Sequence, residues 1–234
     1  MNEEQKKQIH VVLDLETMGL NQDAAIMEIG LVIFNHLGEE GKPNLIRDYS
    51  QAVDLTSSMY HGGTVSAENI TWWMDSERTE ARDAWLAAPK LPITSALNEV
   101  ACIIRDQSVI DPKPLIWGNG VNFDNAILKS AYERLDVKVP WGYRQDADFR
   151  TLKLLYKTRV PEPAFVGTPH IALDDARHEA VWLSQILQYI YGGGVSKPLP
   201  LDITKLDLMS PKILGTAEVT VPDLSIIDDI LSKD

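Results

Sequence analysis

The chain has 234 residues, 44% of them hydrophobic, which is enough to bury one sizeable core. Its formal net charge is −12, from 22 basic and 34 acidic residues, and this argues against a broad electrostatic grip on duplex DNA. The start MNEEQKKQ has no apolar signal region, and no run approaches the roughly 18 apolar residues that a membrane span needs. Cys102 is the single cysteine, so no internal disulfide can form. These features predict a soluble, intracellular protein.

The first predicted element is a strand that ends in two carboxylates. An apolar run rich in β-branched residues begins at Ile9, and Asp14 and Glu16 follow it just before a turn at Gly19. Successive side chains of a strand alternate between its faces, so both carboxylates point the same way while Leu15 turns into the core. Such a pair could hold Mg²⁺, which needs one or two protein carboxylates beside phosphate oxygens of a substrate. A solvated strand end is the alternative.

The next two predicted elements are also strands. Residues 26–34 form an almost continuous apolar run, and residues 48–55 show an alternating tendency. Because the loops between the strands are short, we expect the first three strands to form an antiparallel meander.

Helices are predicted to follow. Ser66 is the expected cap of one helix, with Glu68 in its first turn, and Ser76 is the expected cap of a second helix that runs to Trp85. The apolar spacing in residues 94–105 is typical of an amphipathic helix.

Trp72 and Trp73 are adjacent in the helix expected after Ser66. Neighbouring residues on a helix point about 100° apart, so the two indoles cannot both face one core. One is expected to be buried, and the other could stack on a terminal base, a contact worth ~1 to 3 kcal/mol in single-strand binders. The choice between them stays open, with Trp73 named as the candidate and packing under a loop as the alternative.

The second stretch with candidate site residues is WGNGVNFDNAIL, residues 117–128. It is typical of a strand end, a glycine-containing turn and a helix start, with Asn122 as the expected cap and Asp124 in the first helical turn. This arrangement could present Asp124 as a metal ligand, and Gly118 and Gly120 would let a nucleotide backbone approach closely. A purely helix-terminal role for Asp124 is the alternative.

The third stretch is PHIALDDARHEA, residues 169–180, at the junction between a loop and the last strong helix. Apolar residues share one face of that helix through residues 174–191, and a glycine run stops it. His170 precedes the helix, and Asp174 and Asp175 begin it. Beside a metal, His170 could act as the base that activates water while Asp175 serves as an acid with a distinct role. A structural histidine is the alternative.

Two other segments carry weaker signals. A helix is predicted at residues 148–157, in a basic region that could contact phosphates or form a solvated face. Its basic residues are Arg144, Arg150, Lys153, Lys157 and Arg159. The composition changes after the glycine run, so we expect residues 195–234 to be a separate tail that packs on its own domain, docks a partner or mediates self-association.

Three motifs occur in order along the chain, D-x-E-T at residues 14–17, G-x-x-x-x-F-D at 118–124 and H-x-A-x-x-D at 170–175. Together they resemble the DEDDh class of 3′-to-5′ exonucleases, which includes proofreading exonuclease subunits, ribonuclease T and oligoribonuclease. Segments 69–82 and 148–151 look most similar to the bacteriophage exonuclease A group. The resemblance covers residues 9–191.

The resemblance implies a ribonuclease H-like α/β fold over residues 1–191, a mixed sheet flanked by helices, followed by the C-terminal tail. It also implies two Mg²⁺ or Mn²⁺ ions per site, with His170 taking a proton from the attacking water. The metal-binding carboxylates would be Asp14, Glu16, Asp124 and Asp175. Asp174 is the rival of Asp175, but the four residues between His170 and Asp175 match the motif, and Asp174 is better placed as a helix cap.

The activity implied by the resemblance is hydrolysis of the terminal phosphodiester at single-stranded 3′ ends, with release of nucleoside 5′-monophosphates. DNA is favoured over RNA as the substrate, and an exoribonuclease is the alternative. The expected substrate contacts are Thr17, Met18, Trp73, Asn122, Phe123 and Arg150. An inactive domain that binds nucleic acid or protein is the alternative from another class, and the retained acid cluster argues against it. The expected location is cytoplasmic, in the host cytoplasm if the chain is phage-encoded.

Overall fold

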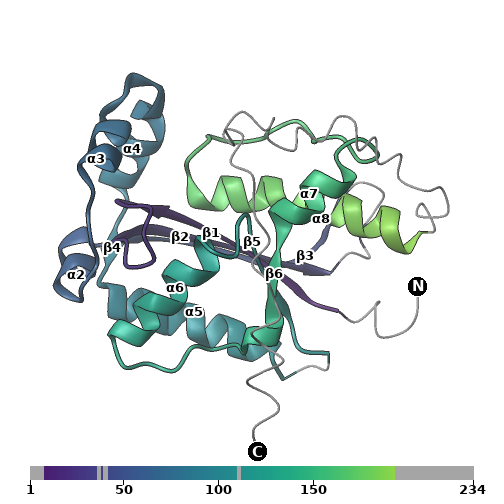
Figure 1. The fold of residues 1–234 in the computed structure, drawn as a ribbon, viewed down its shortest axis with the longest axis horizontal. Coiled ribbons are helices and arrows are strands. Elements are labelled where there is room, and N and C mark those ends of the chain that lie inside the picture. Colours follow the sequence, from purple (N-terminus) through teal and green to yellow (C-terminus); the bar gives the residue numbers. More distant parts are fainter. Residues whose placement is uncertain (1–7, 36–37, 39–41, 110–111, 193–234) are drawn as a thin grey trace, which may run out of the picture. The chain divides into compact units, whose positions relative to one another are not determined.

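A computed structural model describes residues 8–35, 38, 42–109 and 112–192 of the chain (Figure 1). Its centre is a mixed sheet of six strands in the order β4-β3-β2-β1-β5-β6. The strands are β1 (His10–Thr17), β2 (Ile26–Asn35), β3 (Asn44–Val53), β4 (Lys90–Leu91), β5 (Leu115–Gly118) and β6 (Asp146–Asp148). β1 and β3 each run antiparallel to β2, whereas β5 runs parallel to β1. The predicted meander of the first three strands is therefore confirmed.

Helices cover both faces of this sheet (Figure 1). They are α2 (Leu55–Tyr60), α3 (Ala67–Met74), α4 (Thr79–Ala87), α5 (Ile93–Gln107), α6 (Asp124–Arg134), α7 (Phe149–Tyr156) and α8 (Ala172–Tyr191), with 3₁₀ turns η1 (Ser76–Arg78) and η2 (Tyr143–Gln145). α5 and α6 share one core with Leu13 and Leu15 of β1, and α7 and α8 share another core with Val12. The prediction of an α/β mixed sheet flanked by helices is confirmed.

Side-chain caps account for some of the differences between the predicted and observed boundaries. β3 begins and ends before the predicted range, and Asp54 caps α2 directly after it by accepting a hydrogen bond from Thr56 N. Ser66 caps α3, as predicted. The predicted cap at Ser76 is wrong, because Asp75 caps the 3₁₀ turn η1 that precedes α4.

The first turn of α8 approaches β2 closely because β2 has a glycine at that point. A Cβ on Gly30 would lie 2.3 Å from the backbone C and O of Ala172, so a larger residue fits only if the helix moves. Gly30 pairs with Asp14 in the register of β1 and β2. Ala172 N also donates a hydrogen bond of 3.4 Å to the Glu28 carboxylate of β2. The start of α8 is thereby held beside the end of β1.

Two predictions concern regions beyond this core. The tail predicted at residues 195–234 lies outside the described residues, so the domain boundary at residue 191 stays a prediction. Within the described part of the chain, every helix is too short or too polar to cross a membrane.

Candidate active site

The end of β1 presents Asp14 and Glu16 on the sheet face that carries α8. Between them, Leu15 is 4% exposed and packs into the core under α5 and α6, which is the alternation predicted from the sequence. The β1–β2 register shifts between Glu16 and Thr17, an irregularity of the kind that re-aims side chains next to active sites. Both carboxylates line a cavity that β1, α6 and α8 enclose.

Asp124 enters this cavity as the first residue of α6. Its Oδ1 accepts a hydrogen bond from Leu15 N at 3.3 Å, and its Oδ2 accepts one from Gly120 N at 3.5 Å. These bonds tie the start of α6 to the end of β1. The predicted cap at Asn122 is wrong: Phe123 occupies the cap position without a side-chain hydrogen bond, and Asn122 is exposed.

Gly118 allows α6 to lie this close to β5. A Cβ at Gly118 would lie 2.5 Å from Asn125 Oδ1 and 3.1 Å from Asp124 Oδ2. The glycine therefore makes room for side chains of the protein itself, whereas the sequence suggested room for a nucleotide backbone.

His170 lies just before α8 and is joined to Asp175 through its backbone. Its N–H donates a hydrogen bond of 2.7 Å to Asp175 Oδ2, and its φ of 67° is in the left-handed region that non-glycine residues rarely adopt. Its ring packs edge-on against Trp72, with 4.9 Å between ring centroids. The carboxylate of Asp175 thus holds the loop that presents the imidazole.

Asp174 has different partners from Asp175. Its Oδ2 accepts a hydrogen bond of 3.0 Å from Thr168 N, and its Oδ1 lies 3.4 Å from Arg177 Nη1. The predicted N-cap role for Asp174 is wrong, because α8 begins earlier and has Ile171 at its cap position. Asp175, and not Asp174, lines the cavity with the other acids.

The acid cavity has a volume of about 280 Å³. It is lined by Asp14, Leu15, Glu16, Asn119, Phe123, Asp124, Arg150, His170, Asp175 and Glu179. Among the described residues, Glu16, His170 and Asp175 each offer a ligand atom within 4.8 Å of the other two. The structure therefore brings together all four predicted carboxylates, the predicted histidine, and Phe123 and Arg150 from the predicted substrate contacts.

Burial and mutual repulsion perturb the carboxyl groups of this cavity. The pKa values of Asp14 and Glu16 are raised well above their ordinary range, first by burial and then by neighbouring carboxylates. Burial raises the pKa of Asp124 to about 6, although hydrogen bonds from backbone N–H groups oppose the shift. Burial also raises the pKa of Asp175, against the hydrogen bond from His170 N. Ionising all four groups together is unfavourable without a cation.

Glu179 and Asn119 line the acid cavity without having been predicted as site residues, and Lys153 of the predicted basic region contacts both. Glu179 follows Asp175 by one helical turn on α8, and burial raises its pKa to about 8, with Asp124 adding to the shift. Lys153 Nζ donates a hydrogen bond of 2.6 Å to Asn119 Oδ1 and lies 4.0 Å from Glu179 Oε1. The sequence carries one signal for Glu179. It follows Asp175 by four residues, among the apolar residues of one helix face, so it is expected on the same side of the helix as Asp175.

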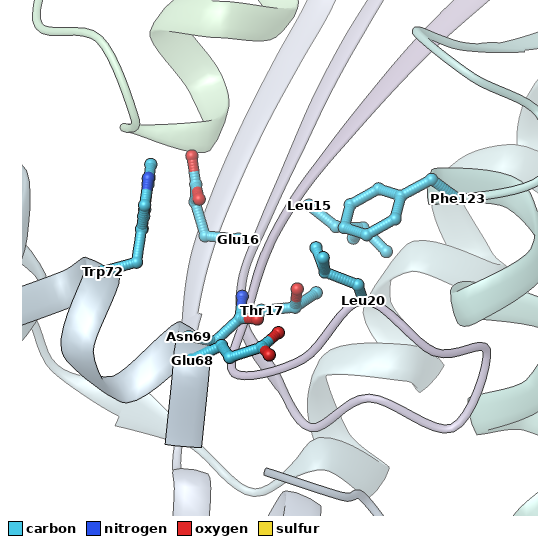
Figure 2. A pocket seen from close by; sticks show the side chains of 8 residues that line it. All are labelled: Leu15, Glu16, Thr17, Leu20, Glu68, Asn69, Trp72 and Phe123. Atoms are coloured by element: carbon cyan, nitrogen blue, oxygen red, sulfur yellow. The ribbon is translucent and has the colours of Figure 1, made fainter. Parts of the chain in front are cut away.

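A second, more apolar cavity of about 310 Å³ adjoins the first and shares Leu15, Glu16 and Phe123 with it. Figure 2 shows Trp72 from α3 on one side of this cavity and Phe123 on the other. The remaining lining residues are Thr17, Leu20, Glu68 and Asn69.

Trp72, and not the candidate Trp73, lines this cavity. Trp72 is 36% exposed, whereas Trp73 is 3% exposed and donates an indole hydrogen bond of 3.1 Å to Thr17 O. Met18 is partly buried and packs with Trp73 in a small core cluster, and neither residue lines the acid cavity or the apolar cavity.

Comparisons with known proteins give a family and a fold. The family model described as the 3′-5′ exoribonuclease Rv2179c-like domain matches residues 9–187. The nuclease domain of 3′hExo, a DEDDh family member, bound to rAMP, is a similar solved structure with a TM-score of 0.50 and 15% identity, over 80% of this chain and 93% of that one. No curated protein sequence matches significantly. The likeness to 3′hExo confirms the predicted fold class, whereas the narrower likeness to the bacteriophage exonuclease A group stays a prediction.

Two other solved structures are also similar. Escherichia coli Exonuclease I in complex with a dA16 oligonucleotide has a TM-score of 0.49 and 12% identity, over 77% of this chain and 41% of that chain. Cell-death related nuclease 4 has a TM-score of 0.44 and 12% identity, over 80% of this chain and 64% of that chain.

Proposed function

The chain belongs to the family of the 3′-5′ exoribonuclease Rv2179c-like domain, and from this premise we propose that it shortens single-stranded RNA from the 3′ end with the help of divalent metal ions. As a member of that family it is a 3′-to-5′ exonuclease, a hydrolase of phosphodiester bonds. The observation that carries the proposal is the convergence of four carboxylates and a histidine, from three distant segments, on one cavity. The expected products are nucleoside 5′-monophosphates.

The donor set of the acid cavity fits a divalent metal. Carboxylate oxygens are the hard ligands that Mg²⁺ and Mn²⁺ prefer, and a cation would relieve the repulsion that raises the pKa values of Asp14 and Glu16. Asp14, Glu16, Asp124 and Asp175 would hold the ions. When bound, the metal supplies positive charge that polarises the scissile phosphate and makes water easier to ionise.

His170 is the residue of this chain proposed to move the proton. A neutral imidazole can accept a proton from the attacking water, and Asp175 fixes the backbone of the histidine while Trp72 limits the movement of its ring. Both contacts reduce the freedom of the side chain before substrate arrives. Among the described residues, no hydrogen bond joins the His170 ring to a carboxylate. The backbone hydrogen bond and the Trp72 contact therefore orient the ring.

The apolar cavity is suited to the terminal nucleoside of the substrate. Glu16 lines both cavities, so a base held in the apolar cavity would place the terminal phosphodiester of the substrate near the acid cavity. Aromatic faces stack on any base at ~1 to 3 kcal/mol, and Trp72 and Phe123 both line this space. The stacking role considered for Trp73 is thus proposed for Trp72. Arg150 lines the acid cavity and is proposed to contact a phosphate of the substrate.

The family description supports RNA as the substrate, whereas the sequence analysis favoured DNA. The test is digestion of matched RNA and DNA oligomers, 5′-labelled and single-stranded, in Mn²⁺. We expect products shortened from the 3′ end, nucleoside 5′-monophosphates, and faster turnover of RNA. Asp14→Asn should abolish release. Asp146→Asn is the matched control, because Asp146 instead accepts hydrogen bonds from Asn125 and Trp141. Absence of monophosphate release would overturn the proposal, and faster turnover of DNA would overturn its choice of RNA.

A further inference from the structure

Glu179 carries a buried oxygen without a partner. The residue is 5% exposed, and within the described residues its Oε2 has no hydrogen bond. Leaving a carboxylate oxygen unpaired in a buried position is costly, and native structures rarely contain one without a reason. The surroundings of Glu179 Oε2 should therefore explain why this oxygen is unpaired.

The cation nearest to Glu179 does not account for this oxygen. Lys153 Nζ lies 4.0 Å from the other oxygen, Oε1, and is already hydrogen-bonded to Asn119 Oδ1 at 2.6 Å. Glu179 instead lines the acid cavity together with Asp14 and Asp124. The unpaired oxygen belongs to a fifth carboxylate in a cavity where four already fit a metal.

We propose that Glu179 is a positioning residue of the metal site, and that its Oε2 accepts a hydrogen bond from water that hydrates the bound ion. The inference rests on the divalent-metal site of the proposed function. Mg²⁺ and Mn²⁺ in such sites keep several waters, each of which needs an acceptor. An indirect contact leaves the four carboxylates of the proposed function, Asp14, Glu16, Asp124 and Asp175, as the direct ligands of the ions.

The test is calorimetric titration of Mn²⁺ alone into the full-length chain and three variants. Glu179→Gln removes the charge and keeps the shape, whereas Glu179→Asp keeps the charge and withdraws the oxygen. Residues outside the coordination shell typically contribute 10- to 100-fold to metal affinity, so we expect both variants to bind Mn²⁺ about 10- to 100-fold more weakly. Asp146→Asn is the control: Asp146 is a partly buried carboxylate outside the acid cavity, and it accepts hydrogen bonds from Asn125 and Trp141. It should lose much less affinity.

A second readout separates positioning from a structural role. In EDTA, Glu179→Gln should melt no lower than wild type, because the amide keeps the shape of the carboxyl group and Oε2 has no hydrogen bond to lose within the described residues. A lower Tm in EDTA with unchanged Mn²⁺ affinity would make Glu179 structural and overturn the inference. So would equal affinity losses in Glu179→Gln and Asp146→Asn, or wild-type affinity in Glu179→Asp. If one Glu179 variant fails to fold, the other decides. Failure of wild type itself to bind Mn²⁺ would instead overturn the proposed metal-dependent function.

Discussion

The carboxylate of Asp124 should lower the free energy of unfolding in the absence of metal and raise it when metal is bound. Replacing Asp124 with asparagine should separate these two effects. Asp124 is 2% exposed, and burial raises its pKa from the ordinary 3.8 to about 6. When the group is ionised, this rise in pKa lowers the free energy of unfolding by on the order of 3 kcal/mol. Asparagine loses one acceptor, which costs about 1 kcal/mol. In EDTA near pH 8, Asp124→Asn should therefore be more stable than wild type by about 2 kcal/mol.

The stability difference should depend on pH with a defined sign. Because the folded-state pKa of Asp124 lies above its unfolded-state value, wild type loses stability as the pH rises from 3.8 to about 6, and the loss is complete above that window. The asparagine has no proton to lose. The advantage of the variant should therefore disappear as the pH is lowered through the same window.

Saturating Mn²⁺ should reverse the order of stability. A ligand that binds only the folded state adds RT ln(1 + [L]/Kd), about 2.7 kcal/mol at one hundred times Kd, and the variant should gain much less. Urea unfolding followed by tryptophan fluorescence, in EDTA and in Mn²⁺, measures both effects.

Asp146→Asn is the control with the opposite sign. Burial raises the pKa of Asp146, but hydrogen bonds from Lys129, Asn125 and Trp141 outweigh burial and lower it. The substitution should therefore destabilise the protein near neutral pH and leave the Mn²⁺ effect intact. Lower stability of Asp124→Asn than of wild type in EDTA near pH 8, or equal stabilisation of both proteins by Mn²⁺, would contradict these expectations.

Four further substitutions test other parts of the site and the elements that support it. His170→Ala should keep the Mn²⁺-induced rise in Tm and lose on the order of 10²- to 10⁴-fold in kcat, as expected for a positioned base; loss of the rise would make His170 a ligand. Trp72→Ala should weaken oligonucleotide binding by ~1 to 3 kcal/mol at unchanged Tm. Trp73→Ala should lower the unfolding free energy by about 3 to 5 kcal/mol, because that indole is buried; the opposite pattern would exchange the two roles. Gly30→Ala should cost about 1 to 3 kcal/mol and weaken Mn²⁺ binding, because its Cβ would displace α8 at Ala172, and normal Mn²⁺ affinity would contradict this.

Local patterns in the sequence were sufficient to predict the framework of the fold. The apolar run before Asp14 and the spacing in residues 94–105 depend only on the period of a strand or helix, and both elements form as predicted. Ser66 caps α3 because a cap needs only a nearby backbone N–H. The order of the three motifs indicated which carboxylates would meet, and the structure brings them to one cavity.

The errors arose where the outcome depends on contacts between distant segments. Helical geometry shows that the side chains of Trp72 and Trp73 diverge, but it does not show which of them is buried. Trp73 is the buried one, and its indole donates a hydrogen bond to Thr17 O, which is distant in the sequence. Asn122 has the right residue type for a cap, yet the start of α6 is tied to β1 through Asp124. Glu179 was overlooked because a glutamate on a helix is usually solvated, and only the packing of α8 on the sheet buries it.

The close contact of α8 with β2 also has a consequence for the nascent chain. β1 with Asp14 and α6 with Asp124 are synthesised well before Asp175 and Glu179 on α8. A ribosome-bound chain that has not yet released α8 lacks the last carboxylates of the acid cavity and the histidine that precedes them. The acid cavity is therefore complete only after α8 has left the exit tunnel and packed against β2 at Gly30.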